Sequence, residues 1–294
     1  MAKQRETARI HLIAAREAPV AVIIRRKPSR LFHIIRWNLR NDAFDHGSWF
    51  RGTIYPFRSD LSWDGELMSY LAMGNHCQTW NGVCRIPRLT TLWEMDNCGT
   101  YNGGGVFWGP KLFLSNAMSA SEARIQSGWP RDIEVRKLQT LRGDDLTSIF
   151  HRFARDGWRL RSGDRESDLC DEDGLMLEDY RQIDAGVLFH RPVRKYPELQ
   201  CRYIGHRSER SRNLIAQTYP HRTGYIFHFE LEGYPDILGP SVDWATRTNK
   251  GDLIWTREGI VYRISMEDLK QGKKPKSFDL NDLQPPEIGR SARS

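Results

Sequence analysis

The sequence has no long apolar run. Its longest stretch, Ala18–Ile24, is far shorter than the roughly 20 residues that a membrane-spanning helix requires. Residues 1–28 carry basic side chains but lack the continuous apolar region of a secretory signal. The sequence therefore predicts neither a membrane partner nor an exported protein.

Cysteine is scarce, and its spacing does not suit a disulfide framework. The chain has 5 cysteines, an odd number, and no Cys-x-x-Cys pair. Free thiols are typical of proteins in a reducing compartment. We therefore expect a cytoplasmic protein whose cysteines pack as small apolar side chains.

Recognisable catalytic and cofactor motifs are also lacking. The chain has no P-loop, no Gly-x-Gly-x-x-Gly after a strand and no Gly-x-Ser-x-Gly elbow. Gly74-Asn75-His76 matches one box of the metallophosphoesterases, but the Asp-x-His and Gly-Asp boxes that complete such a site do not precede it. The sequence favours a non-enzymatic protein with no cofactor and no catalytic residue.

Two sets of side chains are possible metal ligands, and both depart from the usual patterns. One set lacks the close cysteine pair of a structural zinc site; its members are His76, Cys77, Cys84 and Cys98. The other set is Asp168–Asp173, which precedes Gly174. If Gly174 is placed at the sixth position of a calcium-binding loop, two of the essential oxygen ligands of that loop are missing. We predict no metal site, and the sequence leaves both sets open.

The residues that are present are those of an ordinary folded protein. Of the 294 residues, 39% are hydrophobic, 28% are charged and 10 are tryptophan. This apolar share is too high for a disordered chain, and the length allows one large domain with a sizeable core.

The net charge of +7 is unevenly distributed. Residues 1–60 hold twelve Lys or Arg against five Asp or Glu, whereas the rest of the chain holds 32 of each. Within that neutral remainder, Gly163–Tyr180 has eight acidic side chains and Arg191–Arg212 has seven basic ones. Blocks of opposite charge can steer partners or pair with each other.

Most of the chain has the pattern of short strands. Segments rich in β-branched and aromatic residues are bounded by Gly, Asp, Asn or Pro, as strands between turns are. The clearest are Leu31–Trp37, Glu66–Ala72, Leu89–Met95, Lys111–Ser115, Tyr225–Leu231, Asp252–Thr256 and Ile260–Ser265.

One amphipathic helix interrupts the strands, near residues 145–156. Apolar residues from Leu146 to Ala154 recur at helical spacing, and Gly157 is suited to end the helix. Residues 270–294 are polar and contain Lys and Pro. We therefore expect one β-rich domain over residues 7–269 and a flexible tail over residues 270–294.

The segment Asp60–Leu67, Asp-Leu-Ser-x-Asp-Gly-x-Leu, resembles the inner-strand signature of β-propeller blades, with Trp63 in place of the usual proline. Four segments follow one another in the order Trp49–Tyr55, Asp60–Leu67, Ala154–Trp158 and Asp243–Arg263. This order looks like that of a group of uncharacterised bacterial proteins with propeller-like repeats and no known activity. The resemblance covers about residues 19–265. It implies a mainly β, propeller-like fold with irregular blades, in a bacterial protein.

The propeller-like reading favours a protein-interaction module, a scaffold or adaptor whose main partner is another protein. Propeller-like sheets expose loops at one rim, and aromatic and arginine side chains are the usual interface anchors. The residues that we expect in contact with a partner are Arg191, Arg194, Lys195, Arg202, Arg207, Tyr101, Phe107 and Trp108.

Two other functions stay open. Basic patches at residues 25–40 and 191–212 lie near aromatic residues, as in proteins that bind nucleic acid. A hydrolase with a site on the propeller rim is the second alternative, because catalytic triads are formed in space rather than in sequence.

Overall fold

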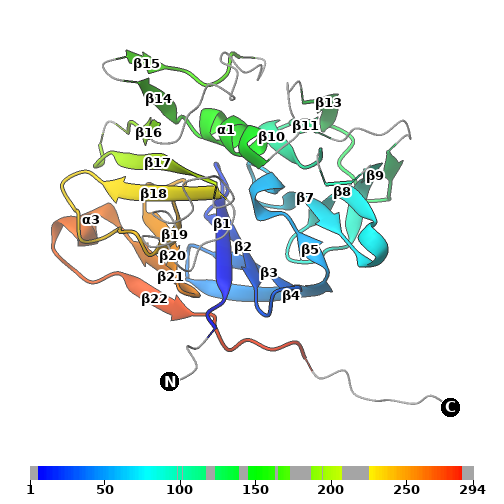
Figure 1. The fold of residues 1–294 in the computed structure, drawn as a ribbon, viewed down its shortest axis with the longest axis horizontal. Coiled ribbons are helices and arrows are strands. Elements are labelled where there is room, and N and C mark those ends of the chain that lie inside the picture. The colour runs from blue at the N-terminus through cyan, green and yellow to red at the C-terminus, as the bar shows by residue number, and fades with distance from the viewer. Residues whose placement is uncertain are drawn as a thin grey trace.

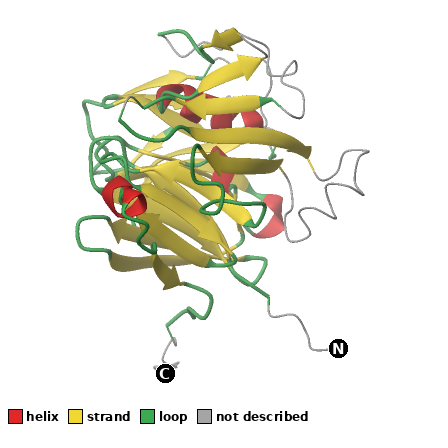
Figure 2. Cartoon of the chain, turned by 90° about the vertical axis from the view of Figure 1, so that its left-hand side faces the viewer, coloured by secondary structure: helices red, strands yellow, loops and turns green. Residues whose placement is uncertain are grey.

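The computed structural model describes residues 6–97, 99–100, 102–116, 123–138, 145–162, 165–172, 187–193, 195–206 and 225–286. Within these residues the chain is mainly β, and its strands form five sheets. We call these sheets blades 1 to 5, because they are arranged as the blades of a propeller (Figure 1). Figure 2 shows that strands make up most of the ribbon, with helices as short insertions.

Blades 1 and 2 come first in the chain. Blade 1 is an antiparallel meander of β1 (Arg9–Ala14), β2 (Val20–Arg26), β3 (Leu31–Asn38) and β4 (Ala43–Arg51). Blade 2 contains β5 (Thr53–Ile54), β6 (Asp60–Leu61), β7 (Leu67–Met73), β8 (Thr79–Arg85), β9 (Thr91–Asn97) and β12 (Arg124–Ile125). The short 3-10 helices η1 (Pro56–Arg58) and η2 (Asn75–Cys77) lie between its strands.

The other blades are less regular. Blade 3 contains β10 (Gly105–Gly109), β11 (Leu112–Ser115) and β13 (Glu134–Lys137), and β13 runs parallel to β11. Blade 4 contains β14 (Arg159–Ser162), β15 (Arg165–Ser167), β16 (Leu188–Arg191), β17 (Leu199–His206) and β18 (Tyr225–Leu231). Blade 5 contains β19 (Val242–Arg247), β20 (Leu253–Arg257), β21 (Ile260–Ile264) and β22 (Lys276–Asp279), with helix α3 (Met266–Lys270) before its last strand.

The predicted turn at Asp60–Leu67 joins β6 to β7. The Ser62 amide donates to the Leu67 carbonyl at 2.8 Å, and the Leu67 amide donates to Ser62 Oγ at 2.9 Å. Gly65 takes the positive φ of 73° that the tight turn requires. Trp63, which stands where propeller motifs have proline, donates from Nε1 to the Phe107 carbonyl at 2.9 Å. The tryptophan therefore connects blade 2 to blade 3.

Helix α1 (Asp145–Arg155) lies between blade 4 and strand β10, as Figure 1 shows. Its apolar side, with Ile149, Phe150 and Phe153, is buried against Phe189 of blade 4. The helix ends where it is predicted to end, at Gly157, whose φ is 80°. The mainly β propeller with one inserted helix is confirmed.

The centre of the propeller is filled by aromatic side chains. Trp244 lies 4.5 Å from the His11 ring and 5.7 Å from the Phe57 ring, between centroids, and it also contacts Phe153 and Phe227. These residues come from blades 1, 2, 4 and 5 and from α1. A common aromatic core therefore holds the blades around the centre.

The first and last blades meet through side chains, not through a shared strand. Arg25, fully buried on β2, donates from Nε to the Leu280 carbonyl at 2.6 Å and from Nη2 to the Asn281 carbonyl at 2.7 Å. Asn281 in turn accepts from the Ala8 amide at 2.7 Å, and Thr256 donates to the Ile10 carbonyl at 3.2 Å. We call this contact the seam.

A second set of charges extends the seam. Arg263 of blade 5 donates to Asp42 at 2.6 Å and to the Leu39 carbonyl at 2.5 Å, both in blade 1, and Lys276 reaches Asp42 at 2.7 Å. Residues 276–279 were expected in a flexible tail, but they form β22 and pair with β21. Strand pairing with β21 and the bonds from Arg25 to the Leu280 and Asn281 carbonyls hold this segment against the domain.

Among the described residues, no helix is long and apolar enough to cross a bilayer.

Candidate functional site

The structure separates the residues that we expected at a contact surface. Lys195 and Arg202 are exposed, and Arg191 is half-buried at the end of β16. Arg194, Arg207 and Tyr101 lie outside the described residues. Trp108 is half-buried, and its Nε1 donates to the Glu172 carbonyl at 3.1 Å.

The expectation for Phe107 is wrong. Its side chain is 1% exposed and packs against Phe113, at 5.0 Å between ring centroids, in the core under blades 2 and 3. The alternating strand β10 turns Phe107 inward and leaves Trp108 on the other face. Phe107 therefore belongs to the core and cannot contact a partner.

The basic patch at residues 25–40 is also not a free surface. Arg25 is buried in the seam, Arg36 pairs with Glu66 at 3.0 Å, and Arg26 lies over the Phe32 ring. Its other arginines, Arg30 and Arg40, are exposed. Arg25 and Arg36 therefore make contacts within the protein, whereas Arg30 and Arg40 are open to solvent.

A buried charge network lies beside α1 and contains the least exposed ion pair among the described residues. Arg155 donates from Nη1 to Asp60, and neither side chain is more than 1% exposed. Asp60 also accepts from the Phe107 amide at 2.8 Å. Burial raises the pKa of Asp60, while the charges of Arg155 and Arg152 oppose that rise. This network ties α1 to blades 2 and 3.

Arg152 lies one turn earlier and faces the centre. Its Nη1 donates to the Ser59 carbonyl at 2.8 Å, and its Nη2 lies 3.2 Å from His11 Nε2. Burial lowers the pKa of Arg152 to about 10. Burial and the charge of Arg152 both lower the pKa of His11, so this imidazole is neutral at pH 7. Its free lone pair is then suited to accept from Arg152.

A hollow lies on blade 4. It holds about 560 Å³ and runs between the end of β18 and the loop that leads to β19. We call it the blade 4 groove. Its lining residues are Gln200, His228, Glu230, Leu231, Glu232, Gly233, Pro235, Leu238, Gly239 and Pro240.

The groove is lined by the exposed prolines Pro235 and Pro240 and by two glutamates, above two buried leucines. Leu231 and Leu238 are buried, whereas Glu232 is exposed and the Glu230 side chain is 56% exposed. His228 lies 3.3 Å from Glu230. No lysine or arginine lines the groove, and none within the described ranges pairs with Glu230 or Glu232. The groove therefore presents negative charge beside apolar surface.

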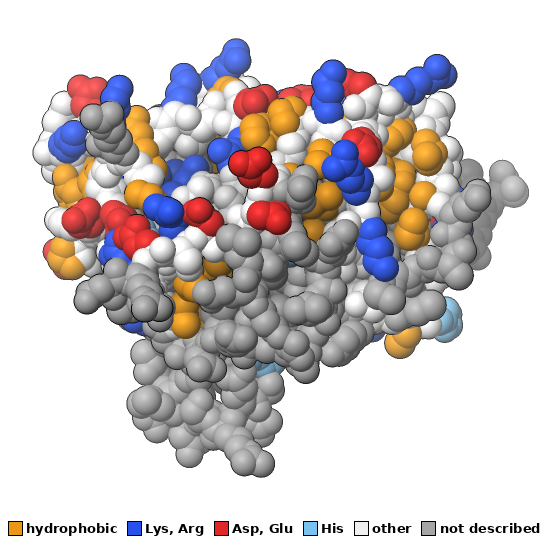
Figure 3. Space-filling model, turned by 90° about the horizontal axis from the view of Figure 1, so that it is seen from above, with side chains coloured by type: hydrophobic (Ala, Val, Ile, Leu, Met, Phe, Trp, Pro, Cys, Tyr) orange, Lys and Arg blue, Asp and Glu red, His pale blue; other side chains and the backbone are white. Residues whose placement is uncertain are grey.

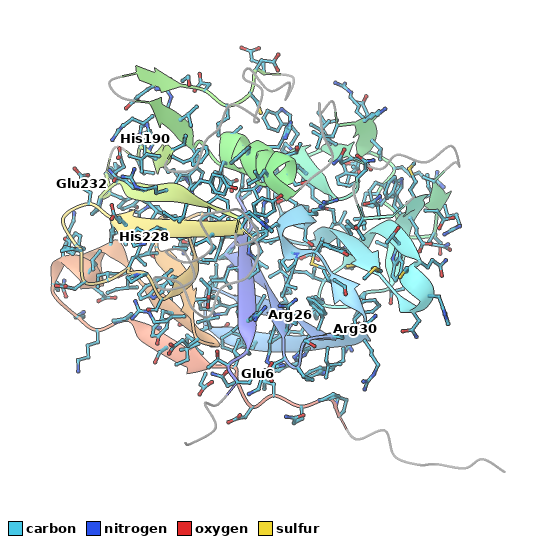
Figure 4. The ribbon with its side chains drawn as sticks, viewed as in Figure 1. Glu6, Arg26, Arg30, His190, His228 and Glu232 are labelled. Carbon is cyan, nitrogen blue, oxygen red and sulfur yellow. The ribbon has the colours of Figure 1, made fainter. Side chains whose placement is uncertain are left out.

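A histidine–glutamate cluster lies beside the groove, because His190 pairs with Gln200 and Gln200 with Glu230 on one face of blade 4. His190 Nδ1 lies 3.1 Å from Glu198 Oε2, and its Nε2 lies 3.3 Å from Glu166 Oε1. Burial acts to raise the pKa of Glu198, but bonds from Gln200 and His190 lower it overall. Gln200, which lines the groove, donates to Glu198 at 2.8 Å. Figure 4 labels His190, His228 and Glu232 on this blade and its following loop.

The loop that forms the outer wall is held in one shape. Glu198 and Glu232 bond each other, from the Glu232 amide to the Glu198 carbonyl at 3.0 Å and from the Glu198 amide to Glu232 Oε2 at 3.2 Å. Turn bonds follow at Tyr234 and Ile237, and Pro235 and Pro240 restrict the backbone. The groove is therefore pre-formed, which lowers the entropy cost of binding.

Neither sequence-derived metal set forms a site in the described residues. No group of three or more His, Cys, Asp or Glu is placed to hold a metal ion there. Cys77 is exposed, but Cys84 is buried, and burial raises the pKa of its thiol to about 12. Cys98 and Asp173 lie outside the described residues.

Surface charge adds little to the nucleic-acid alternative. On the described part of the face in Figure 3, Lys and Arg side chains lie among Asp and Glu side chains and form no continuous basic field. In the patch at residues 191–212, Arg191 interacts electrostatically with Asp156. The described part of this patch also contains an acidic residue, Glu198.

The groove residues were not among those expected from the sequence. The signal is present in Tyr225–Leu231, where His228 and Glu230 alternate with buried Phe227 and Phe229. That alternation shows that they share one face of the strand, but it does not show that a loop faces them.

Comparison with known proteins gives a fold-level likeness only. No family model matches the chain, and no curated protein matches it in sequence. An uncharacterized protein from Listeria monocytogenes EGD-e aligns over 96% of this chain and 86% of its own, at 10% identity and a TM-score of 0.33. The β-propeller domain of the Trilobed protease from Pyrococcus furiosus, described as having an open velcro topology, aligns over 88% and 83%, at 11% identity and a TM-score of 0.33.

These scores are too low to carry an argument about function. The propeller arrangement depends on this chain's own five sheets, on the seam between blades 1 and 5 and on the shared aromatic centre.

Proposed function

We propose that this protein is a protein-interaction module whose blade 4 groove binds a basic segment of a partner protein. The observation that supports the proposal is the groove itself: a pre-formed hollow lined by exposed prolines and by two glutamates that no described lysine or arginine neutralises. A segment with Lys or Arg beside a small apolar residue is complementary to such a surface.

The size of the groove fits a segment and not a whole domain. About 560 Å³ accommodates a few side chains of an extended chain. Glu230 lies near the end of β18 and Glu232 in the turn that follows, and both line the groove. An extended peptide presents alternate side chains to one face, so two of its basic residues can meet the two glutamates.

The test uses the full chain and a short fluorescent Lys-rich peptide, with a Glu-rich peptide of equal length as the ligand control. We expect saturable binding of the Lys-rich peptide by fluorescence anisotropy, weakened by added salt because the contacts are exposed. The Glu230→Gln/Glu232→Gln variant should bind more weakly, by up to about thirtyfold, since each of two exposed charge pairs contributes up to about 1 kcal/mol.

A matched control removes two acids elsewhere. Asp132 and Glu134 are exposed on blade 3, and Asp132→Asn/Glu134→Gln changes the net charge by the same amount. This control should bind like the wild type. Equal loss in both variants, or binding of a single-stranded oligonucleotide in place of the peptide, would overturn the proposal.

A further inference from the structure

Strand β13 is an open edge at the outer margin of blade 3 (Figure 1). In the described residues blade 3 has three strands, in the order β10-β11-β13, whereas each other blade has at least four. All four residues of β13, Glu134–Lys137, are exposed, and no described strand pairs with its outer side. Such an edge offers backbone donors and acceptors to a further strand.

The backbone of β13 alternates between groups that bond to β11 and groups that point away from it. The Glu134 amide donates to the Lys111 carbonyl at 2.8 Å, and the Leu138 amide donates to the Ser115 carbonyl at 2.8 Å. In a parallel pair every second residue bonds to the neighbouring strand, so the amide and carbonyl of Val135 face outward. Among the described residues, no hydrogen bond reaches these two groups.

The apolar side of blade 3 continues to this edge. Val135 stands opposite Phe113 of β11, whose ring is buried in the core of blades 2 and 3. Val135 itself is 36% exposed, and it and Ile125 are the two exposed large apolar side chains of the described residues. A further strand beside β13 would cover the Val135 side chain, as cross-strand neighbours do within a sheet.

The charges of β13 match a reversed copy of the same strand. Glu134 and Arg136 flank Val135 on one face, and Arg136 Nε donates to Glu134 at 2.6 Å. In an antiparallel pair centred on Val135, Glu134 of each copy stands opposite Arg136 of the other. A parallel pair in register would place glutamate beside glutamate. Charges on an edge strand normally discourage pairing, but these discourage only strands that are not complementary.

We propose that β13 is a self-association edge, which pairs antiparallel with β13 of a second copy of this chain. In this pair the two Val135 residues exchange their outward amide-to-carbonyl bonds, and their side chains cover each other. The contact between Glu134 and Arg136 forms twice, as a two-fold interface requires. The paired segment is short, so the dimer is reversible. The blade 4 groove takes no part in it.

Sedimentation equilibrium of the full chain over a concentration series measures the association. We expect the weight-average mass to rise with concentration towards twice the chain mass. Val135→Pro removes the central outward amide but leaves the bonds to β11, since proline is tolerated where its nitrogen faces away from the sheet. Both central hydrogen bonds are then lost, so this variant should associate about tenfold or more weakly. Val135→Ile, which keeps the amide and the branched apolar side chain, is the control and should associate like the wild type.

Exchange of charge tests whether the strand pairs with itself. Glu134→Arg places arginine opposite Arg136, and Arg136→Glu places glutamate opposite Glu134, so each variant alone should associate more weakly than the wild type. An equimolar mixture of the two should regain association, because every cross-strand pair is then of opposite sign. Both variants lack the bond between Glu134 and Arg136 within one chain, so that bond cannot explain the recovery. Circular dichroism confirms that each variant is folded.

Three results would overturn the inference. The first is a wild-type chain that stays monomeric throughout the concentration series. The second is a folded Val135→Pro variant that associates like the wild type. The third is a mixture of the two charge variants that associates no better than either variant alone.

Discussion

The seam and the blade 4 groove use charged side chains in opposite ways. At the seam, Arg25 is fully buried and donates to two carbonyls of the last segment, and Arg263 is shared between Asp42 and Asp252. At the groove, Glu230 and Glu232 are exposed and no described lysine or arginine reaches them. Charges that the chain satisfies internally hold the blades together, whereas charges that it leaves at a pre-formed hollow are available to a partner.

This difference also determines how much unfolding free energy is lost when a charged side chain is replaced in each region. A buried charge that loses its partner must remain desolvated and unpaired, which costs several kcal/mol. An exposed charge remains hydrated after the same change and costs little. Substitutions should therefore affect stability at the seam and in the interior, and binding at the groove.

The largest loss of stability is expected at Asp60. Asp60→Ala leaves Arg155 buried without its first partner and removes the acceptor of the Phe107 amide, so we expect unfolding free energy to fall by about 3–5 kcal/mol. Urea unfolding measures it. Asp132→Asn, at an exposed acid, should change stability by less than about 0.5 kcal/mol. Similar small effects in both variants would mean that the Asp60–Arg155 ion pair does not stabilise the fold.

A smaller loss is expected at the seam. Arg25→Met keeps most of the buried side-chain volume but removes both bonds to the carbonyls of Leu280 and Asn281, and it should cost about 3 kcal/mol. Arg30→Met, at an exposed arginine of the same blade, is the matched control. Limited proteolysis should show faster cleavage of residues 276–286 in Arg25→Met only. An intact C-terminal segment in that variant would show that the seam closes by other means.

Acid should weaken blade 1 through His33. Its ring is buried and stacks on Trp49 at 3.9 Å, and burial, with the charges of His46 and Arg25, lowers its pKa from 6.5 to about 3. The unfolded chain therefore binds a proton more readily, so stability falls as the pH drops from 6.5 towards 3, by up to about 1.4 kcal/mol per pH unit. In His33→Phe this part of the pH dependence should disappear. An unchanged slope of unfolding free energy against pH would mean that other groups cause the loss of stability in acid.

The smallest effect on stability is expected at the groove. Glu230→Gln/Glu232→Gln should unfold within about 0.5 kcal/mol of the wild type, because both side chains are exposed. Urea unfolding of this variant therefore complements its loss of peptide binding. A large destabilisation would show that the two glutamates serve the fold, and the contrast with the seam would fail.

The sequence was sufficient for the local elements and for the kind of fold. The helical spacing from Leu146 and the stop at Gly157 predict α1, and the Asp60–Leu67 motif predicts the β6–β7 turn. These features depend on neighbours in the chain, which a periodic pattern records directly. The propeller-like fold was predicted from the resemblance of that motif to the inner-strand signature of propeller blades.

The site was much harder to predict, because it depends on distant contacts. Arg25 and Arg202 look alike in sequence, yet one is buried against Asn281 and the other is exposed. Phe107 was expected at a surface because it stands beside Trp108 in a glycine-rich turn, but the core of blades 2 and 3 takes one of the two rings. The groove requires β18 and the loop before β19 to face each other, which no local pattern specifies.

Hydrogen exchange with and without the Lys-rich peptide tests the central claim most directly. The account predicts slower exchange on peptide addition in residues 228–241 and 198–202, which form the groove, and no change in the seam strands β1, β2 and β22. Protection confined to another blade, or no protection at a peptide concentration that saturates anisotropy, would contradict the assignment of the blade 4 groove as the partner site.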